Sequence, residues 1–138
     1  MYRGLLLTLR NPNAAAEAVD EAMRRALERW DVVGTYEHPD RWVYRVAYNR
    51  AVSIWRKTRR EAFDILVEPS LEDGLPDPDV SRALARLAVH WRSVVVARYY
   101  LDWSTEITAD ALGIAEGTVK SCLSRAIKRL EAELGEQI

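Results

Sequence analysis

Cysteine is almost missing from this chain of 138 residues, which contains Cys122 and no other. One thiol cannot form an internal disulfide, and the two histidines, His38 and His90, each stand alone in the sequence, without the spacing of metal ligands. A glycine-rich phosphate loop is missing as well. We therefore expect no disulfide, no metal and no cofactor.

The sequence also lacks the residue groupings of common active sites. No nucleophile or paired carboxylate stands at a meaningful spacing beside either histidine. Neighbouring acids such as Asp20 and Glu21 point in different directions on a helix. We expect a protein that is not an enzyme and has no small-molecule substrate.

Glycine and proline are few, at six and five residues, while 49% of the chain is hydrophobic and 30% is charged. This is the composition of a folded globular protein. No apolar run approaches the length of a membrane span, and the N-terminal LLLTL is too short for a signal-peptide core. The sequence therefore predicts a cytoplasmic protein with no membrane partner.

A large excess of charge of one sign is missing too, since the formal net charge is −1. The charges are instead separated along the chain. Residues 41–60 contain seven Arg or Lys and no acid, whereas residues 61–79 contain seven Asp or Glu and no base. A nucleic-acid-binding face can therefore exist in a chain whose overall charge is close to zero.

Apolar residues recur at helical spacing along most of the chain. One such stripe follows the turn at Asn11-Pro12-Asn13, and a second runs through residues 41–60. Prolines and acids between 68 and 79 interrupt the pattern, and four further helical segments follow, the last two separated by Gly113. We predict an all-α fold of two small helical domains joined by an acidic, Pro-containing linker, the second being a four-helix helix-turn-helix domain. The predicted boundaries are 1–61, 62–79 and 80–138.

The last predicted helix has a face suited to DNA. Its apolar residues, from Val119 to Leu134, share one side, while Lys120, Ser121 and Arg125 lie on the other. Hydroxyls and long cations at the start of such a helix can contact phosphates and base edges in the major groove. An ordinary amphipathic helix with a solvated face would show the same pattern. The preceding glycine turn favours DNA.

The basic segment places cations and aromatic rings on one stripe. Single-stranded nucleic acid fits this mixture, because bases stack on the rings while guanidinium groups neutralise the backbone. The alternative is that Trp55 and a tyrosine pack against the linker. The stripe, whose members recur at spacings of three and four, consists of Arg41, Tyr44, Arg45, Tyr48, Val52, Trp55, Arg56 and Arg59.

Three segments in this order resemble the RNA polymerase sigma factors of the extracytoplasmic-function group, especially the actinobacterial kind. AAAEAVDEAMRRAL is similar to the polymerase-binding helix of sigma region two, and HPDRWVYRVAYNRAVSIWRKTRR to the promoter-melting segment after it. Residues 83–130 are similar to region four, which reads the upstream promoter element. The resemblance implies two helical DNA-binding domains on a flexible tether, with core RNA polymerase and promoter DNA as partners. An anti-sigma factor is a further candidate partner.

The resemblance, together with the stripes, also predicts which residues make these contacts. We expect polymerase to be bound by Asp20, Glu21 and Arg24. We expect the strand-separated minus-ten element to be bound by Trp42, Arg45, Tyr48, Asn49, Trp55, Arg56 and Arg59. We expect the minus-thirty-five duplex to be bound by Thr118, Lys120, Ser121, Cys122 and Arg125.

Region four departs from the family pattern at several positions. Ala115 stands where a serine usually caps the recognition helix, Cys122 stands where an arginine is usual, and Ile107 and Thr108 look shifted by one position. The competing interpretation is therefore a sigma-like regulatory or scaffold protein with weakened DNA reading. Cys122 lies either at the edge of the DNA face or at the core margin. We also hypothesise that the acidic linker folds back over the basic stripe or region four.

Overall fold

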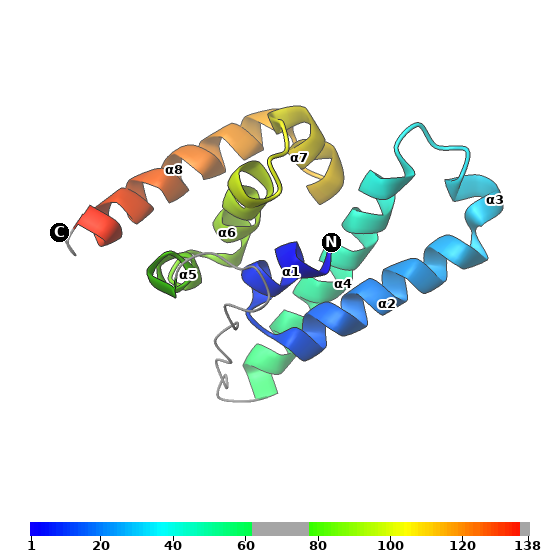
Figure 1. The fold of residues 1–138 in the computed structure, drawn as a ribbon, viewed down its shortest axis with the longest axis horizontal. Helices are drawn as coiled ribbons and strands as arrows, with labels where there is room; N and C mark the ends of the chain where they lie inside the picture. The colour runs from blue at the N-terminus through cyan, green and yellow to red at the C-terminus, as the bar shows by residue number, and fades with distance from the viewer. Residues whose placement is uncertain (62–77, 136–138) are drawn as a thin grey trace.

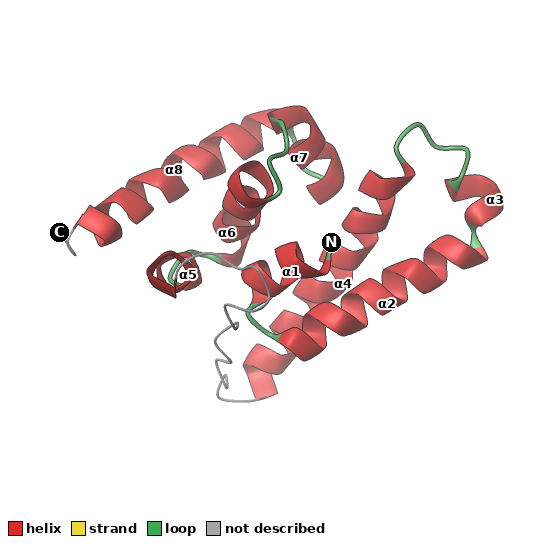
Figure 2. Ribbon diagram, viewed as in Figure 1, coloured by secondary structure: helices red, strands yellow, loops and turns green. Residues whose placement is uncertain are grey.

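The computed structural model describes residues 1–61 and 78–135, which form helices joined by turns, with no strand among them (Figures 1 and 2). The predicted all-α fold is confirmed. The predicted linker, 62–79, lies outside the described residues except for its last two positions, which begin a helix instead, and the hypothesis that it folds back stays a prediction. The first half of the molecule consists of α1 (Tyr2–Leu9), α2 (Pro12–Glu28), α3 (Trp30–Val33) and α4 (Pro39–Glu61). The second half consists of α5 (Pro78–Ala85), α6 (Val89–Val95), the π-helical turn η2 (Val96–Tyr100), α7 (Thr105–Leu112) and α8 (Glu116–Gly135).

Helix α1 has leucines facing every direction and lies between the other helices of the first half and the helices of the second half (Figure 1). The four leucines between positions 5 and 9 are each at most 5% exposed, because α1 contacts α2 and α4 of the first half and α5, α6 and η2 of the second. A helix that is hydrophobic all round requires neighbours on all sides. Arg10, a buried residue with left-handed backbone, ends the helix and donates from Nη1 to the Ser81 carbonyl at 2.8 Å and to Ser81 Oγ at 2.9 Å. Arg10 therefore joins α1 to α5.

Helices α2 and α4 pack side by side through alanines. Asn11 begins α2, because its Oδ1 accepts a hydrogen bond from the Ala14 amide at 3.1 Å, as the turn signal in the sequence predicted. Helix α4 returns alongside α2 (Figure 1), and its Ala47 and Ala51 are fully buried in the shared core. Small side chains allow the two helices to approach closely. This pair is the scaffold that positions the basic stripe.

The second half packs α8 against α5, α6 and α7. Val119 and Ala126 of α8 are fully buried, as predicted for the inward side of this helix. One cluster of buried residues continues from α1 and α4 to Val94, Val96 and Val119, so the two halves share a hydrophobic core. The division into separate domains stays a prediction. Among the described helices, none has both the length and the apolar composition needed to cross a membrane.

Candidate nucleic-acid interface

The predicted minus-ten residues of α4 differ widely in exposure. Asn49 and Arg56 are exposed, Trp42 and Trp55 are half-buried, and Tyr48 is buried. The side chain predicted at position 59 lies outside the described part of the chain, although the backbone there belongs to α4. The helix therefore carries the predicted residues together, but part of the stripe is covered.

Arg45 is held by the end of α7. Its Nε donates to the main-chain carbonyl of Asp110 at 3.0 Å, and its Nη2 donates both to that carbonyl and to the Asp110 carboxylate, the latter at 3.0 Å. Arg41, one helical turn earlier, lies 3.4 Å from the Asp110 carboxylate and 3.8 Å from the Glu106 carboxylate. Asp110 follows Arg45 by 65 residues, and the sequence analysis did not single it out. We call these four residues, Arg41, Arg45, Glu106 and Asp110, the α4–α7 ion cluster.

Two tyrosines of the stripe are buried by the second half. Tyr44 is 3% exposed and meets Trp103 edge-on, with ring centroids 4.8 Å apart. Tyr48 is 7% exposed, and its hydroxyl lies 3.1 Å from Ser93 Oγ of α6. Desolvation raises the pKa of both phenols, so both remain neutral near pH 7. The sequence interpretation of these rings as stacking platforms therefore does not describe this conformation, because α6 and the segment before α7 cover them.

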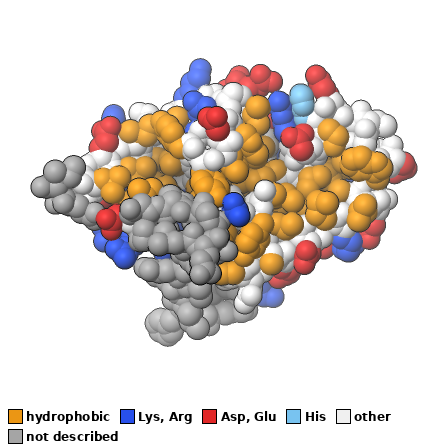
Figure 3. All heavy atoms as spheres, viewed as in Figure 1, with side chains coloured by type: hydrophobic (Ala, Val, Ile, Leu, Met, Phe, Trp, Pro, Cys, Tyr) orange, Lys and Arg blue, Asp and Glu red, His pale blue; other side chains and the backbone are white. Residues whose placement is uncertain are grey.

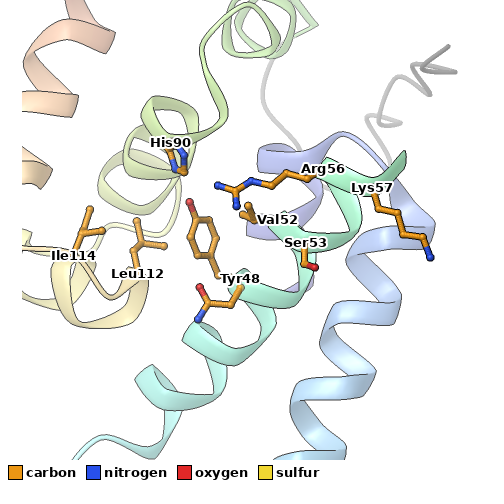
Figure 4. Close-up of a pocket in the computed structure, with 9 residues that line it drawn as sticks. Tyr48, Val52, Ser53, Arg56, Lys57, His90, Leu112 and Ile114 are labelled. Atoms are coloured by element: carbon orange, nitrogen blue, oxygen red, sulfur yellow. The ribbon is translucent and has the colours of Figure 1, made fainter. Parts of the chain in front are cut away.

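Beyond Tyr48, a cleft of about 630 Å³ runs between α4 and the second half. Figure 4 shows the ends of Tyr48, Arg56 and His90 pointing toward one another across it. Cations and hydrogen-bonding groups border an apolar floor, a combination that suits a ligand with both charged and flat apolar parts. The lining residues are Tyr48, Asn49, Val52, Ser53, Arg56, Lys57, His90, Leu112 and Ile114.

The turn between α7 and α8 presents the start of α8 to solvent. Gly113 ends α7 in the left-handed conformation, with φ at 71°, which L side chains rarely adopt. The four α8 residues predicted to contact duplex DNA, apart from Cys122, are all exposed. Ser121 Oγ donates to the main-chain carbonyl one turn earlier at 3.1 Å. This exposed group consists of Thr118, Lys120, Ser121 and Arg125.

Cys122 and Thr108 occupy the core side of this unit. Cys122 is half-buried, packs against the shared core and lies close enough to Tyr48 to influence the pKa of that phenol. Of the two expected positions, this is the one at the margin of the core. A contact of the thiol with DNA stays a prediction. Thr108 is fully buried while Ile107 is half-buried, so α7 places a hydroxyl where the family pattern has an apolar side chain.

The predicted polymerase contacts lie together on α2. Glu21 accepts hydrogen bonds from Arg24 at 2.8 Å and from Arg25 at 2.9 Å. The hydrogen bond with Arg24 lowers the pKa of the Glu21 carboxyl and raises the pKa of the Arg24 guanidinium. Asp20 is exposed beside this charged group. This hydrogen-bonded ion pair therefore keeps both of its partners charged near pH 7.

Sequence reasoning missed the apolar side chains that accompany these charges. Met23, Leu27 and Trp30 are 46%, 74% and 55% exposed, at the end of α2 and the start of α3. Figure 3 shows hydrophobic side chains on the half of the molecule that α2, α3 and α4 form. An apolar residue of a helix can be recognised as exposed from the sequence only when the buried side of the helix is known. In α2 the buried side consists of alanines.

Comparison with known proteins places this geometry in a family. The family model described as "Sigma-70, region 4" matches residues 79–130. The RNA polymerase sigma-E factor of Streptomyces antibioticus is 36% identical over 130 residues, covering 90% of this chain and 72% of that protein. The ECF RNA polymerase sigma factor SigL of Mycobacterium tuberculosis is 35% identical over 136 residues, covering 88% and 75%. The sigma factor RpoE of Bartonella quintana, solved in complex with the anti-sigma factor NepR, superposes with a TM-score of 0.78 at 24% identity, covering 97% of this chain and 89% of that one.

The helix-turn-helix in the second half and the basic helix in the first agree with these matches, which show a transcription initiation factor of the sigma class. The coverage and sequence identity of these relatives identify the group within the sigma class. The chain belongs to the extracytoplasmic-function sigma factors of RNA polymerase.

Proposed function

We propose that this chain binds core RNA polymerase through α2 and directs it to a specific set of promoters. In this proposal α8 reads the minus-thirty-five duplex and α4 holds the strand-separated minus-ten element. The similarity to proteins named as RNA polymerase sigma factors extends over about nine-tenths of the chain, which supports roles for both halves. An anti-sigma factor is a candidate regulator, because the structural neighbour was solved with one. We expect the protein to act in the cytoplasm, with the polymerase.

The exposed start of α8 is the observation that carries this proposal. Val119 and Ala126 are both fully buried, which fixes the rotation of α8 about its axis. Lys120 and Arg125 must therefore point outward, beside the hydroxyl of Thr118. The first turns of a recognition helix are the part that enters the major groove, where hydroxyls contact phosphates and long cations reach phosphates or guanine edges.

The polymerase contact rests on the outer face of α2. A well-exposed set of apolar side chains, including Leu27 and Trp30, lies beside the charged group around Glu21. Apolar anchors bordered by charges are typical of protein–protein interfaces. We expect a partner surface with an apolar depression flanked by both signs of charge.

Run-off transcription tests the proposal. Core RNA polymerase from a Streptomyces species is mixed with the full chain and a library of genomic fragments. We expect the chain to co-purify with the core enzyme and to produce discrete transcripts that the core enzyme alone does not make. Co-purification without discrete transcripts would favour the competing sigma-like scaffold.

A matched pair of variants then tests the role of α8. Lys120→Ala should reduce transcript yield about tenfold, because one lost base or phosphate contact costs about 1 to 3 kcal/mol. Lys128→Ala removes the same charge from an exposed site two turns further along α8 and should change the yield little. Equal effects of the two substitutions would contradict groove entry by the start of α8.

A further inference from the structure

The cleft between α4 and the second half is lined by cations and by apolar side chains. Helix α4 supplies six of its nine lining residues, among them Arg56 and Lys57. The other three, His90, Leu112 and Ile114, come from the second half. None of these nine residues, all of which lie in the described part of the chain, is acidic. The cleft therefore attracts an anion.

The Tyr48 hydroxyl offers this cleft a hydrogen-bond acceptor. The Ser93 hydroxyl donates its only hydrogen to the His90 carbonyl at 2.8 Å, so at 3.1 Å from Tyr48 it accepts the hydrogen of the phenol. The Tyr48 oxygen keeps its lone pairs, and Figure 4 shows this end of the ring pointing toward Arg56 and His90. A ligand that fits the cleft therefore combines a negative charge with a hydrogen-bond donor.

The size and the apolar part of the cleft define the rest of the ligand. Its volume of about 630 Å³ lies within the range of about 300 to 1,000 Å³ that is usual for small-molecule sites. Val52 and Leu112, both buried in the shared core, form apolar lining on which a flat ring can pack. Asn49 and Ser53, both exposed, add an amide and a hydroxyl. Inorganic phosphate alone would leave most of this volume unfilled.

We propose that the cleft is a binding site for a free nucleotide, with the phosphate against Arg56 and His90 and the base on Val52 and Leu112. A guanidinium binds phosphate by donating hydrogen bonds from two nitrogens. A nucleotide joins this anion to a flat ring and to the hydroxyl or amino groups that can donate to Tyr48. The site goes beyond the proposed function, because its residues from the second half are not among those assigned to DNA. Arg56 serves both ligands, whereas His90 serves only the nucleotide.

The two histidines of the chain allow the site to be tested on the whole protein by proton NMR. His90 lines the cleft, whereas His38 is exposed just before α4, and His38→Ala identifies the signal of each imidazole. AMP, GMP, CMP and UMP are titrated separately. We expect at least one of them to shift the His90 signal to saturation and to leave the His38 signal unchanged. That nucleotide should bind about tenfold more tightly than inorganic phosphate or its own nucleoside, because each of these lacks one of the two recognised parts.

Two matched pairs of variants locate the site, with binding of the radiolabelled nucleotide measured by equilibrium dialysis. Arg56→Ala should weaken nucleotide binding about tenfold, because it removes the charged contact with the phosphate. Arg50→Ala removes the same charge from α4 at a position paired with Glu17 and should leave nucleotide binding unchanged. His90→Ala should weaken nucleotide binding, and His38→Ala should not.

Binding of a fluorescent oligothymidine strand to the same variants separates a nucleotide site from a DNA contact. Loss of nucleotide binding in His90→Ala with unchanged oligonucleotide binding supports the proposal. An equal loss of both would assign the cleft to the DNA surface and overturn the proposal. It is also wrong if none of the four nucleotides shifts the His90 signal, or if phosphate alone binds as tightly as the nucleotide. Failure of the proposed function is a separate result, the absence of discrete transcripts in the run-off assay.

Discussion

Thr108 and Thr8 allow the cost of an unpaired buried hydroxyl to be measured within this fold. Both side chains are fully buried. Thr8 Oγ1 donates to the Gly4 carbonyl at 2.8 Å, whereas Thr108 Oγ1 has no hydrogen-bond partner among the described residues. The same substitution, Thr→Val, therefore removes a satisfied hydroxyl at one site and an unsatisfied one at the other.

The expected effects have opposite signs. A buried polar group without a partner costs about 1 to 3 kcal/mol, so Thr108→Val should raise the free energy of unfolding by about 1 kcal/mol. A satisfied hydrogen bond contributes about 1 kcal/mol net, so Thr8→Val should lower it by a similar amount. The two variants should thus differ by about 2 kcal/mol.

Urea unfolding followed by the far-ultraviolet circular dichroism of the helices measures this difference. We expect a higher urea concentration at the unfolding midpoint for Thr108→Val and a lower one for Thr8→Val. The slope of the unfolding free energy against urea concentration should be the same for both. A loss of stability in Thr108→Val as large as that in Thr8→Val would refute the reasoning. Such a loss would mean that the Thr108 hydroxyl is satisfied in solution.

Two further substitutions test other buried side chains. Desolvation, and to a smaller extent the nearby Arg10, lower the pKa of Arg92 to about 10. The positive charge of Arg92 therefore destabilises the folded state fully below pH 10, and this destabilisation decreases as the pH rises above 10. Arg92→Met should therefore raise the free energy of unfolding at pH 7 by about 1 kcal/mol. The difference in stability between this variant and wild type should become smaller above pH 10. A variant less stable than wild type at pH 7 would contradict this prediction. Cys122→Arg should lower the thermal midpoint, because the half-buried thiol packs against the core; an unchanged midpoint with tighter duplex binding would instead place position 122 on the DNA face.

The sequence predicts those elements whose apolar residues lie on one side. Helices α2, α4 and α8 each have such a stripe, and the turn at Gly113 is visible because left-handed backbone favours glycine. Helix α1 could not be predicted in the same way, because its leucines face every direction and show no helical period. Its burial depends on five neighbouring elements that no local pattern reveals.

The covered state of α4 was also beyond prediction from local pattern. The spacing of Arg45 and Tyr48 places them on one stripe, as observed, but it cannot show that Asp110 and Ser93 will face them. Those contacts join residues far apart in the chain and depend on how the two halves pack. A stripe that suits nucleic acid also suits an internal acidic partner, and only the structure distinguishes the two.

Promoter opening by α4 is the central claim, and mapping of unpaired thymines with permanganate tests it most directly. Arg56 is exposed on the cleft side of α4, whereas Arg50 of the same helix pairs with Glu17 of α2 at 2.7 Å. On a promoter found by run-off transcription, we predict reactive thymines in the minus-ten element with wild type and with Arg50→Ala, and a strong loss of reactivity with Arg56→Ala at an unchanged thermal midpoint. Full reactivity with Arg56→Ala, or an equal loss with Arg50→Ala, would contradict the account.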